Sequence, residues 1–219
     1  MSRIFSVHTV FLVILGYPMS YIEFVGTLFY LWSVWLITKK NMLTWPVGIV
    51  SVLLYMALFY QIRLYSDALE QAYYLGACLY GWWYWSKAGR RGKTVADVTF
   101  SPRRAIIAWV FITAILSVLL GAFMSRVHIW MPAFFPEPAS YPYLDALTTV
   151  MSFVAMWLMA RKHTESWIYW IIVDVIGIWL YYAKEVRFIS LLYAILLVLA
   201  TRGLIAWTRG EANSLKIAI

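Results

Sequence analysis

The chain has 219 residues, of which 63% are hydrophobic and 13% are charged, and its formal net charge is +8. Soluble globular chains are about 45–50% apolar and about 25% charged, so a water-soluble fold of this composition has no interior large enough for its apolar side chains. The apolar residues form blocks of about 17 to 20, the length that a helix needs to cross a bilayer. Roughly ten-residue alternating segments, which indicate a transmembrane barrel, are not found. The sequence therefore predicts an all-α membrane protein.

Apolar blocks bounded by charge, proline or glycine predict seven transmembrane helices. An N-terminal segment, 1–19, precedes them and is expected to lie at the membrane interface or to be partly inserted. A C-terminal tail, 208–219, follows them. The expected spans are residues 20–38, 45–62, 68–86, 105–124, 144–160, 166–182 and 189–207.

Lysine and arginine are shared unequally between the two sides of this arrangement. The loops 39–44, 87–104 and 161–165, with the tail and the adjoining helix ends, hold thirteen of the eighteen. Because positive loops stay in the cytoplasm, the C-terminus is expected on the cytoplasmic side of the membrane and the N-terminus outside. The basic residues lie between apolar blocks and not along one face, so nucleic-acid binding is not expected. The outer loop 125–143 carries four prolines and is expected to be non-helical.

The chain has one cysteine, Cys78, and three histidines. The histidines show no metal-ligand spacing, so neither a metal site, a cofactor nor an enzyme activity is expected. No ATP-binding motif is present either.

An internal repeat appears when the sequence is shifted by 122 positions, which aligns 21–85 with 143–207 without a gap. The alignment predicts two parallel three-helix units, 20–86 and 144–207, joined by 87–143 with the fourth span. Such repeats place a substrate at their interface near the membrane midplane, which favours a transporter over a structural anchor. The most telling matches are Trp35 with Trp157, Trp45 with Trp167, Trp85 with Trp207, and Lys39-Lys40 with Arg161-Lys162.

Asp174 lies near the centre of the sixth span, where a carboxylate costs a few kcal/mol unless it is paired, hydrated or protonated. We expect Asp174 to bind substrate. The alternative is that it is protonated or paired with a Ser or Tyr side chain and only holds helices together. Glu70 and Gln71 begin the third span, where Glu70 could equally stabilise the helix amino end.

Aromatic residues expected near these acids are Tyr73 and Tyr74 in the third span and Trp170 and Trp179 in the sixth, which begins with Trp167. Aromatic faces beside a carboxylate suit a flat cationic ligand, through cation–π contacts of about 1–2 kcal/mol, although packing would use the same residues. The interfacial aromatic belt is expected to contain Trp32, Trp35, Trp82, Trp83 and Trp85.

Gly48 and Ser51 are small residues on the second span, so neighbouring groups can approach its backbone closely there. Small residues of this kind serve either close helix packing or ligand contact. Both therefore stay candidates for the substrate site.

Four segments of the chain form a distinctive pattern: Trp45-Pro46-Val47-Gly48, Leu64-Tyr65-Ser66-Asp67 with Gln71, Tyr80-Gly81-Trp82, and Trp167-Ile168-Tyr169-Trp170 followed by Asp174. Together they resemble the PnuC family of bacterial vitamin transporters, and the resemblance runs from about Tyr21 to Trp207. It implies a location in the bacterial inner membrane and a SWEET-like fold of three plus one plus three helices, which agrees with the internal repeat. It also implies a homotrimer and facilitated diffusion of nicotinamide riboside, which a cytosolic vitamin kinase then traps by phosphorylation.

The resemblance also assigns residues to the substrate site. Trp167 and Trp170 match the family's W-x-x-W motif, and Gln71 matches its third-helix glutamine. Asp174 departs from the family, because the nicotinamide riboside transporters carry asparagine there. An acid adds charge to the acceptor, so the positive ring of the ligand is expected to matter more than its sugar. Thiamine, which a related branch carries, is the alternative substrate, and a proton-coupled carrier with Asp174 as the titrating group is the alternative mechanism.

Overall fold

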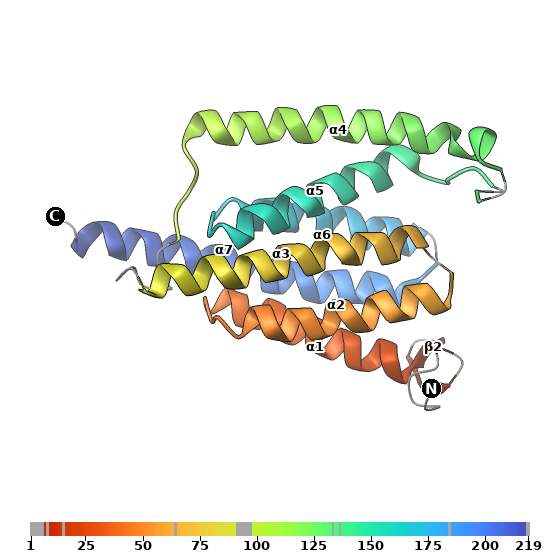
Figure 1. The fold of residues 1–219 in the computed structure, drawn as a ribbon, viewed down its shortest axis with the longest axis horizontal. Coiled ribbons are helices and arrows are strands. Elements are labelled where there is room, and N and C mark those ends of the chain that lie inside the picture. Colours follow the sequence, from red (N-terminus) through yellow and green to blue (C-terminus); the bar gives the residue numbers. More distant parts are fainter. Residues whose placement is uncertain are drawn as a thin grey trace.

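The structure is a computed structural model that describes residues 7, 9–14, 16–63, 65–90, 98–132, 134–135, 137–183 and 185–217. Within these ranges, seven helices run along one common axis (Figure 1). They follow a short antiparallel hairpin of β1 (Val10–Ile14) and β2 (Tyr17–Ser20). The helices are α1 (Tyr21–Thr38), α2 (Thr44–Gln61), α3 (Tyr65–Arg90), α4 (Arg103–Trp130), α5 (Pro142–Ala160), α6 (Ser166–Ala183) and α7 (Arg187–Ile217).

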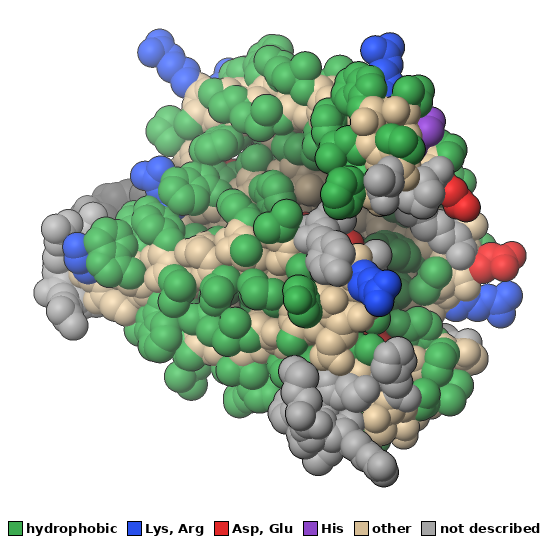
Figure 2. Space-filling model, turned by 45° about the vertical axis from the view of Figure 1, so that its right-hand side comes forward, with side chains coloured by type: hydrophobic (Ala, Val, Ile, Leu, Met, Phe, Trp, Pro, Cys, Tyr) green, Lys and Arg blue, Asp and Glu red, His purple; other side chains and the backbone are tan. Residues whose placement is uncertain are grey.

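The expected all-α membrane fold is confirmed. Among the described residues, six of the seven helices, all but α3, are long and apolar enough to cross a membrane. Hydrophobic side chains cover most of the helical flanks, and most charged side chains stand toward the ends (Figure 2). Each of the seven expected spans coincides with a helix, to within a few residues at most ends.

Two helices run further than expected. α4 continues to Trp130, into the loop expected at 125–143, because its first proline, Pro132, comes only after the helix has ended. α7 continues to Ile217, so most of the expected tail is helical. Residues 1–6 and 91–97, parts of the expected N-terminal segment and cytosolic loop, lie outside the described residues.

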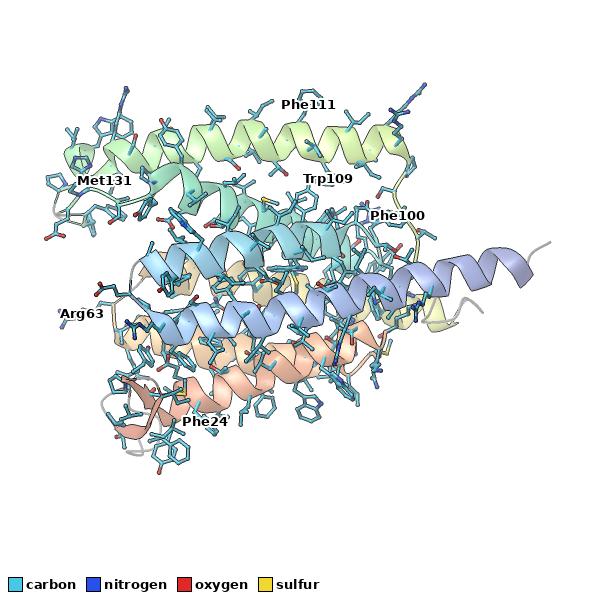
Figure 3. All side chains as sticks on the ribbon, turned by 180° about the vertical axis from the view of Figure 1, so that it is seen from behind. Phe24, Arg63, Phe100, Trp109, Phe111 and Met131 are labelled. Atoms are coloured by element: carbon cyan, nitrogen blue, oxygen red, sulfur yellow. The ribbon has the colours of Figure 1, made fainter. Side chains whose placement is uncertain are left out.

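Six helices form the body of the molecule, and α4 lies at its edge (Figure 1). α2 packs between α1 and α3, and α6 packs between α5 and α7, while α1 contacts α7 and α3 contacts α5. α4 packs mainly on α5. Trp109 points from α4 toward the bundle, whereas Phe111, 64% exposed, points away (Figure 3). The outer side of α4 is therefore an apolar surface.

The two ends of the bundle differ in charge. We call the end with the connections 39–43 and 161–165 the basic end. The opposite end, with 62–64 and 131–141, carries Asp67 and Asp145 in the first turns of α3 and α5, and we call it the acidic end. The hairpin lies at the acidic end (Figure 1).

A cluster of four tryptophans closes the bundle toward the basic end. Each is at most 1% exposed, and neighbouring rings meet with centroids 5.3, 6.2 and 5.5 Å apart. The assignment of Trp85 to the interfacial belt is therefore wrong, whereas the other four expected belt tryptophans are 41–52% exposed. The cluster consists of Trp45, Trp85, Trp207 and Trp167.

Two of these indoles hydrogen-bond to distant helix ends. Trp85 Nε1, on α3, donates to the carbonyl of Ala160 at the end of α5, at 3.0 Å. Trp207 Nε1, on α7, donates to the carbonyl of Ile37 at the end of α1, at 3.1 Å. The two bonds join the same pairs of helices, α3 with α5 and α7 with α1, that contact each other along the bundle.

The other two indoles lie against glycines. A Cβ atom at Gly81 would come 2.4 Å from the Trp45 ring, and one at Gly203 would come 2.5 Å from the Trp167 ring. Contacts that short do not occur, so no larger residue fits at either position without a shift. Glycine is therefore needed here for α3 to approach α2 and for α7 to approach α6.

Candidate functional site

A cavity of about 340 Å³ lies between all the helices of the body. Trp45 and Trp167 line it toward the basic end, so the tryptophan cluster forms its floor. Phe59, Asp67 and Tyr181 line it toward the acidic end. α4 contributes none of its lining residues.

α6 presents one face to this cavity. Trp167, Trp170 and Asp174 line it, at the three- and four-residue spacing of one helix side. Asp174 is 3% exposed, whereas Val175 and Trp179 are 52% and 55% exposed. The carboxyl group of Asp174 is thus inside the bundle and not on the lipid-facing exterior.

α3 supplies two further carboxylates. Asp67 and Glu70 line the cavity together with Gln71 and Tyr74, and the Tyr74 hydroxyl donates to Glu70 Oε1 at 2.9 Å. Glu70 lies in the second turn and not the first, because α3 begins at Tyr65. Glu70 and Tyr74 are four residues apart, so they lie one turn from each other on the same face of α3, where the Tyr74 hydroxyl can reach the Glu70 carboxylate.

The cavity has acidic and aromatic groups but no basic ones. Among the described residues that line it are three carboxylates, Asp67, Glu70 and Asp174, and no Lys, Arg or His. Charges act more strongly in a low-dielectric interior than in water, so ionised carboxylates here would attract a cation and repel an anion.

A second hollow, of about 300 Å³, adjoins the cavity near the acidic end. It adds a fourth carboxylate, Asp145, and the hydroxyl groups of Thr148 and Thr149. Basic side chains are again missing from the described residues around it. The two hollows share six lining residues: Asp67, Glu70, Ser152, Val173, Tyr181 and Tyr193.

Eight of the nine residues predicted for the site line the cavity, and Tyr73 does not. The Tyr73 hydroxyl donates to the carbonyl of Phe153 at 2.7 Å, and its ring packs on the Phe153 ring at 4.3 Å. Adjacent residues of a helix point about 100° apart, and on α3 Tyr74 lines the cavity while Tyr73 contacts Phe153 of α5. The eight are Asp174, Glu70, Gln71, Trp170, Trp167, Tyr74, Gly48 and Ser51.

Ser51 has a structural contact as well, because its hydroxyl donates to the carbonyl of Gly26 on α1 at 2.9 Å.

Several lining residues were not predicted. The repeat could have found some of them, because moving a predicted lining residue by 122 positions often gives another lining residue: Ser51 leads to Val173, and Gln71 leads to Tyr193. The unpredicted polar and aromatic lining residues include Tyr30, Tyr55, Asp67, Ser152, Tyr181 and Tyr193.

Known proteins match the chain along most of its length. The profile of the family described as "Nicotinamide mononucleotide transporter" matches residues 20–209. The nicotinamide riboside transporter PnuC of Escherichia coli is 30% identical over 207 residues, which cover 88% of this chain and 87% of the relative. The riboflavin/roseoflavin transporter RibM of Streptomyces davaonensis is 29% identical, over 84% of this chain and 83% of the relative.

A crystal structure of the vitamin B3 transporter PnuC has the same fold, with a TM-score of 0.64 at 22% identity over 88% of this chain and 83% of that one. The six apolar helices and the transporter relatives together make the chain a multi-pass bacterial membrane protein. The match of the family profile to residues 20–209 and the identity with the Escherichia coli protein show that the chain belongs to the nicotinamide mononucleotide transporter family, which includes PnuC.

Proposed function

We propose that this protein carries a cationic vitamin across the membrane by facilitated diffusion, and that the vitamin is nicotinamide riboside. One observation carries the proposal: a cavity between the helices is lined by three carboxylates and the ring of Trp170, without a basic residue among its described lining. The pyridinium ring of nicotinamide riboside is flat and positive. It can stack on Trp170 while Asp174 balances its charge.

The same lining discriminates between related compounds. A phosphate group would face carboxylates with no basic side chain to receive it, so nicotinamide mononucleotide should bind much more weakly than its riboside. Thiamine, with its positive thiazolium ring, is the second candidate. Riboflavin is the substrate that the name of RibM gives, but it has no positive ring to pair with Asp174.

The proposed architecture is two three-helix units, α1–α3 and α5–α7, with α4 between them as a seventh crossing helix. The helix contacts support this architecture. The first helix of each unit contacts the third helix of the other unit, since α1 contacts α7 and α5 contacts α3. The pairs Trp45–Gly81 and Trp167–Gly203 support it too, since they are 122 residues apart in the chain. α3 is less apolar than the other helices, and its polar side chains include the lining residues Asp67, Glu70 and Gln71.

In the proposed mechanism, the two units rock about the bound vitamin. Asp174, Glu70 and Gln71 hold its charge and polar groups, and Trp170, Tyr74 and the Trp167 floor surround its rings. Release toward the basic end requires the tryptophan cluster to part. The hydrogen bonds of Trp85 and Trp207, which join α3 to α5 and α7 to α1, would then break.

The orientation follows from the charges. The basic end would face the cytoplasm, so the vitamin would enter from outside through the acidic hollow with Asp145. A cytosolic kinase would then trap it by phosphorylation, and the protein would form a homotrimer, as the family resemblance implies.

Uptake by the purified protein in sealed lipid vesicles tests the proposal. Labelled nicotinamide riboside should equilibrate without ATP or an ion gradient, and unlabelled riboside inside the vesicles should accelerate its uptake by counterflow. Thiamine should compete more weakly, and nicotinamide mononucleotide least. Uptake no faster than in protein-free vesicles would reject the proposed function, and the strongest competition by the mononucleotide would reject the role of the carboxylates.

Proton coupling is the second candidate mechanism, because Asp174 and Glu70 are ionisable groups inside the bundle. It predicts that an imposed pH gradient drives accumulation above equilibrium and that an uncoupler abolishes this accumulation. A uniporter shows neither effect.

A further inference from the structure

Gly48 of α2 lines the cavity, but the packing of the helices does not require a glycine there. A Cβ atom at this position would lie 3.5 Å from Cys78 Sγ and 3.6 Å from Ser33 Oγ, which are ordinary van der Waals distances. At Gly81 the corresponding distance is 2.4 Å, to the ring of Trp45. Gly81 is therefore explained by helix packing, and Gly48 is not.

The other unit places a tryptophan at the position that corresponds to Gly48. Trp170 is 122 residues later in the chain and lines the same cavity. One turn further along, Val52 of α2 corresponds to Asp174 of α6, and both also line it. At these two pairs of positions, α6 presents Trp170 and Asp174 to the cavity, whereas α2 presents a glycine and an apolar side chain.

We propose that Gly48 determines which vitamins the site accepts. Without a side chain, it lets the α2 backbone come close to a ligand, so that a planar ring fits between α2 and Trp170. In the bound state, the substrate's ring thus occupies the space next to Gly48. This inference rests on the proposed function and adds to it a size limit on the substrate, set by α2.

A series of substitutions tests this role, because each larger side chain at position 48 should narrow the space for the ring. Calorimetry of the detergent-solubilised full chain with nicotinamide riboside should give a dissociation constant about fivefold higher for Gly48→Ala. For Gly48→Leu it should be higher by at least about fiftyfold. The apparent melting temperature of Gly48→Ala should not fall, because its Cβ makes only ordinary contacts.

Gly76 provides the matched control. It lies on α3, is exposed, and has no atom within 4 Å of where its Cβ would be. Gly76→Ala and Gly76→Leu put the same side chains on a helix of the same bundle but outside the cavity lining, and should leave the dissociation constant within about twofold of the wild type.

The outcomes separate the inference from the proposed function. If the wild-type protein binds no cationic vitamin, both the proposed function and the role of Gly48 are rejected. Wild-type binding that is unchanged in the Gly48 variants, or weakened equally in the Gly76 variants, would overturn the inference and leave the proposed function standing. If Gly48→Leu fails to fold, Gly48→Ala decides the question alone, because its Cβ fits.

Discussion

The two walls of the cavity occupy matching positions in the repeated sequence but offer different chemistry. At the floor the walls are alike, since Trp45 corresponds to Trp167 and each lies on a glycine. Further toward the acidic end the two units differ: Val52 of α2 corresponds to Asp174 of α6, and Glu70 of α3 corresponds to Leu192 of α7. Residues that hold helices together can be the same in both units, because both units pack alike. Residues that contact the ligand cannot be the same in both units, because the ligand has no twofold symmetry and each unit contacts a different side of it.

The largest effect should come from making the two walls alike at Asp174. Asp174→Val gives α6 the side chain that α2 has at position 52, and removes the carboxylate one helical turn from Trp170. Losing the charge partner of a desolvated cation costs about 2–5 kcal/mol, so the affinity for nicotinamide riboside should fall about 30-fold or more. Calorimetry and vesicle uptake would measure the loss.

Two further variants sharpen this result. Asp174→Asn keeps the size and one acceptor and should lose less affinity than Asp174→Val. Val52→Asp, added to Asp174→Val, moves the carboxylate to the corresponding position of the other wall and should restore part of the affinity. Full activity of Asp174→Val alone would show that this carboxylate does not bind the substrate.

The second prediction concerns the floor, where the units are alike. A methyl group at Gly81 or at Gly203 would overlap a tryptophan ring. Gly81→Ala and Gly203→Ala should each destabilise the protein, by about 1–3 kcal/mol, and by similar amounts. Apparent melting temperatures in detergent would show this, with Gly76→Ala unaffected. A large loss at only one of the two glycines would contradict the structural equivalence of the units.

The third prediction tests the bonds between units. Trp85→Phe and Trp207→Phe keep a ring in the cluster but remove the donors to Ala160 and Ile37. Each should cost about 1 kcal/mol of stability, because each leaves a helix-end carbonyl without its indole. If parting of the cluster limits the rate of transport, both variants should also equilibrate vitamin faster in vesicles. Unchanged stability in both would indicate that water replaces the indoles at no cost.

The helices could be predicted from the sequence because lipid requires long apolar blocks. The ends of α4 and α7 could not, because hydropathy marks where apolar residues stop and not where helical hydrogen bonding stops. α4 ends only before Pro132, and α7 continues with polar residues beyond Trp207. Trp85 was misplaced for a related reason: a tryptophan near a helix end indicates the interface unless a second helix covers it.

Asp174 and Glu70 could be predicted as lining residues, because a carboxylate in a transmembrane helix is costly and stands out. Asp67 was missed because it precedes the expected span 68–86.

Tyr193 could have been found as the repeat partner of Gln71, but Tyr30 could not, because its partner Ser152 was not predicted either. Tyrosine is common in this chain, and nothing local separates a lining tyrosine from a packed one. The direction of each side chain depends on how the helices are rotated, and the sequence pattern gives this only where strongly polar residues mark one side. On α3, Glu70 is such a residue. On α1 the acidic residue is Glu23, which lies in the first turn and is not among the residues that line the cavity.

The smallest effect should separate two neighbouring tyrosines of α3. Tyr73→Phe removes a hydrogen bond to Phe153 outside the cavity lining, so it should lower the melting temperature slightly and leave riboside affinity within about twofold. Tyr74→Phe removes the donor to Glu70 Oε1, so that carboxylate would need a new partner and the affinity should change several-fold. Equal effects of the two variants on affinity would contradict the structure, in which Tyr74 lines the cavity and Tyr73 contacts Phe153 of α5.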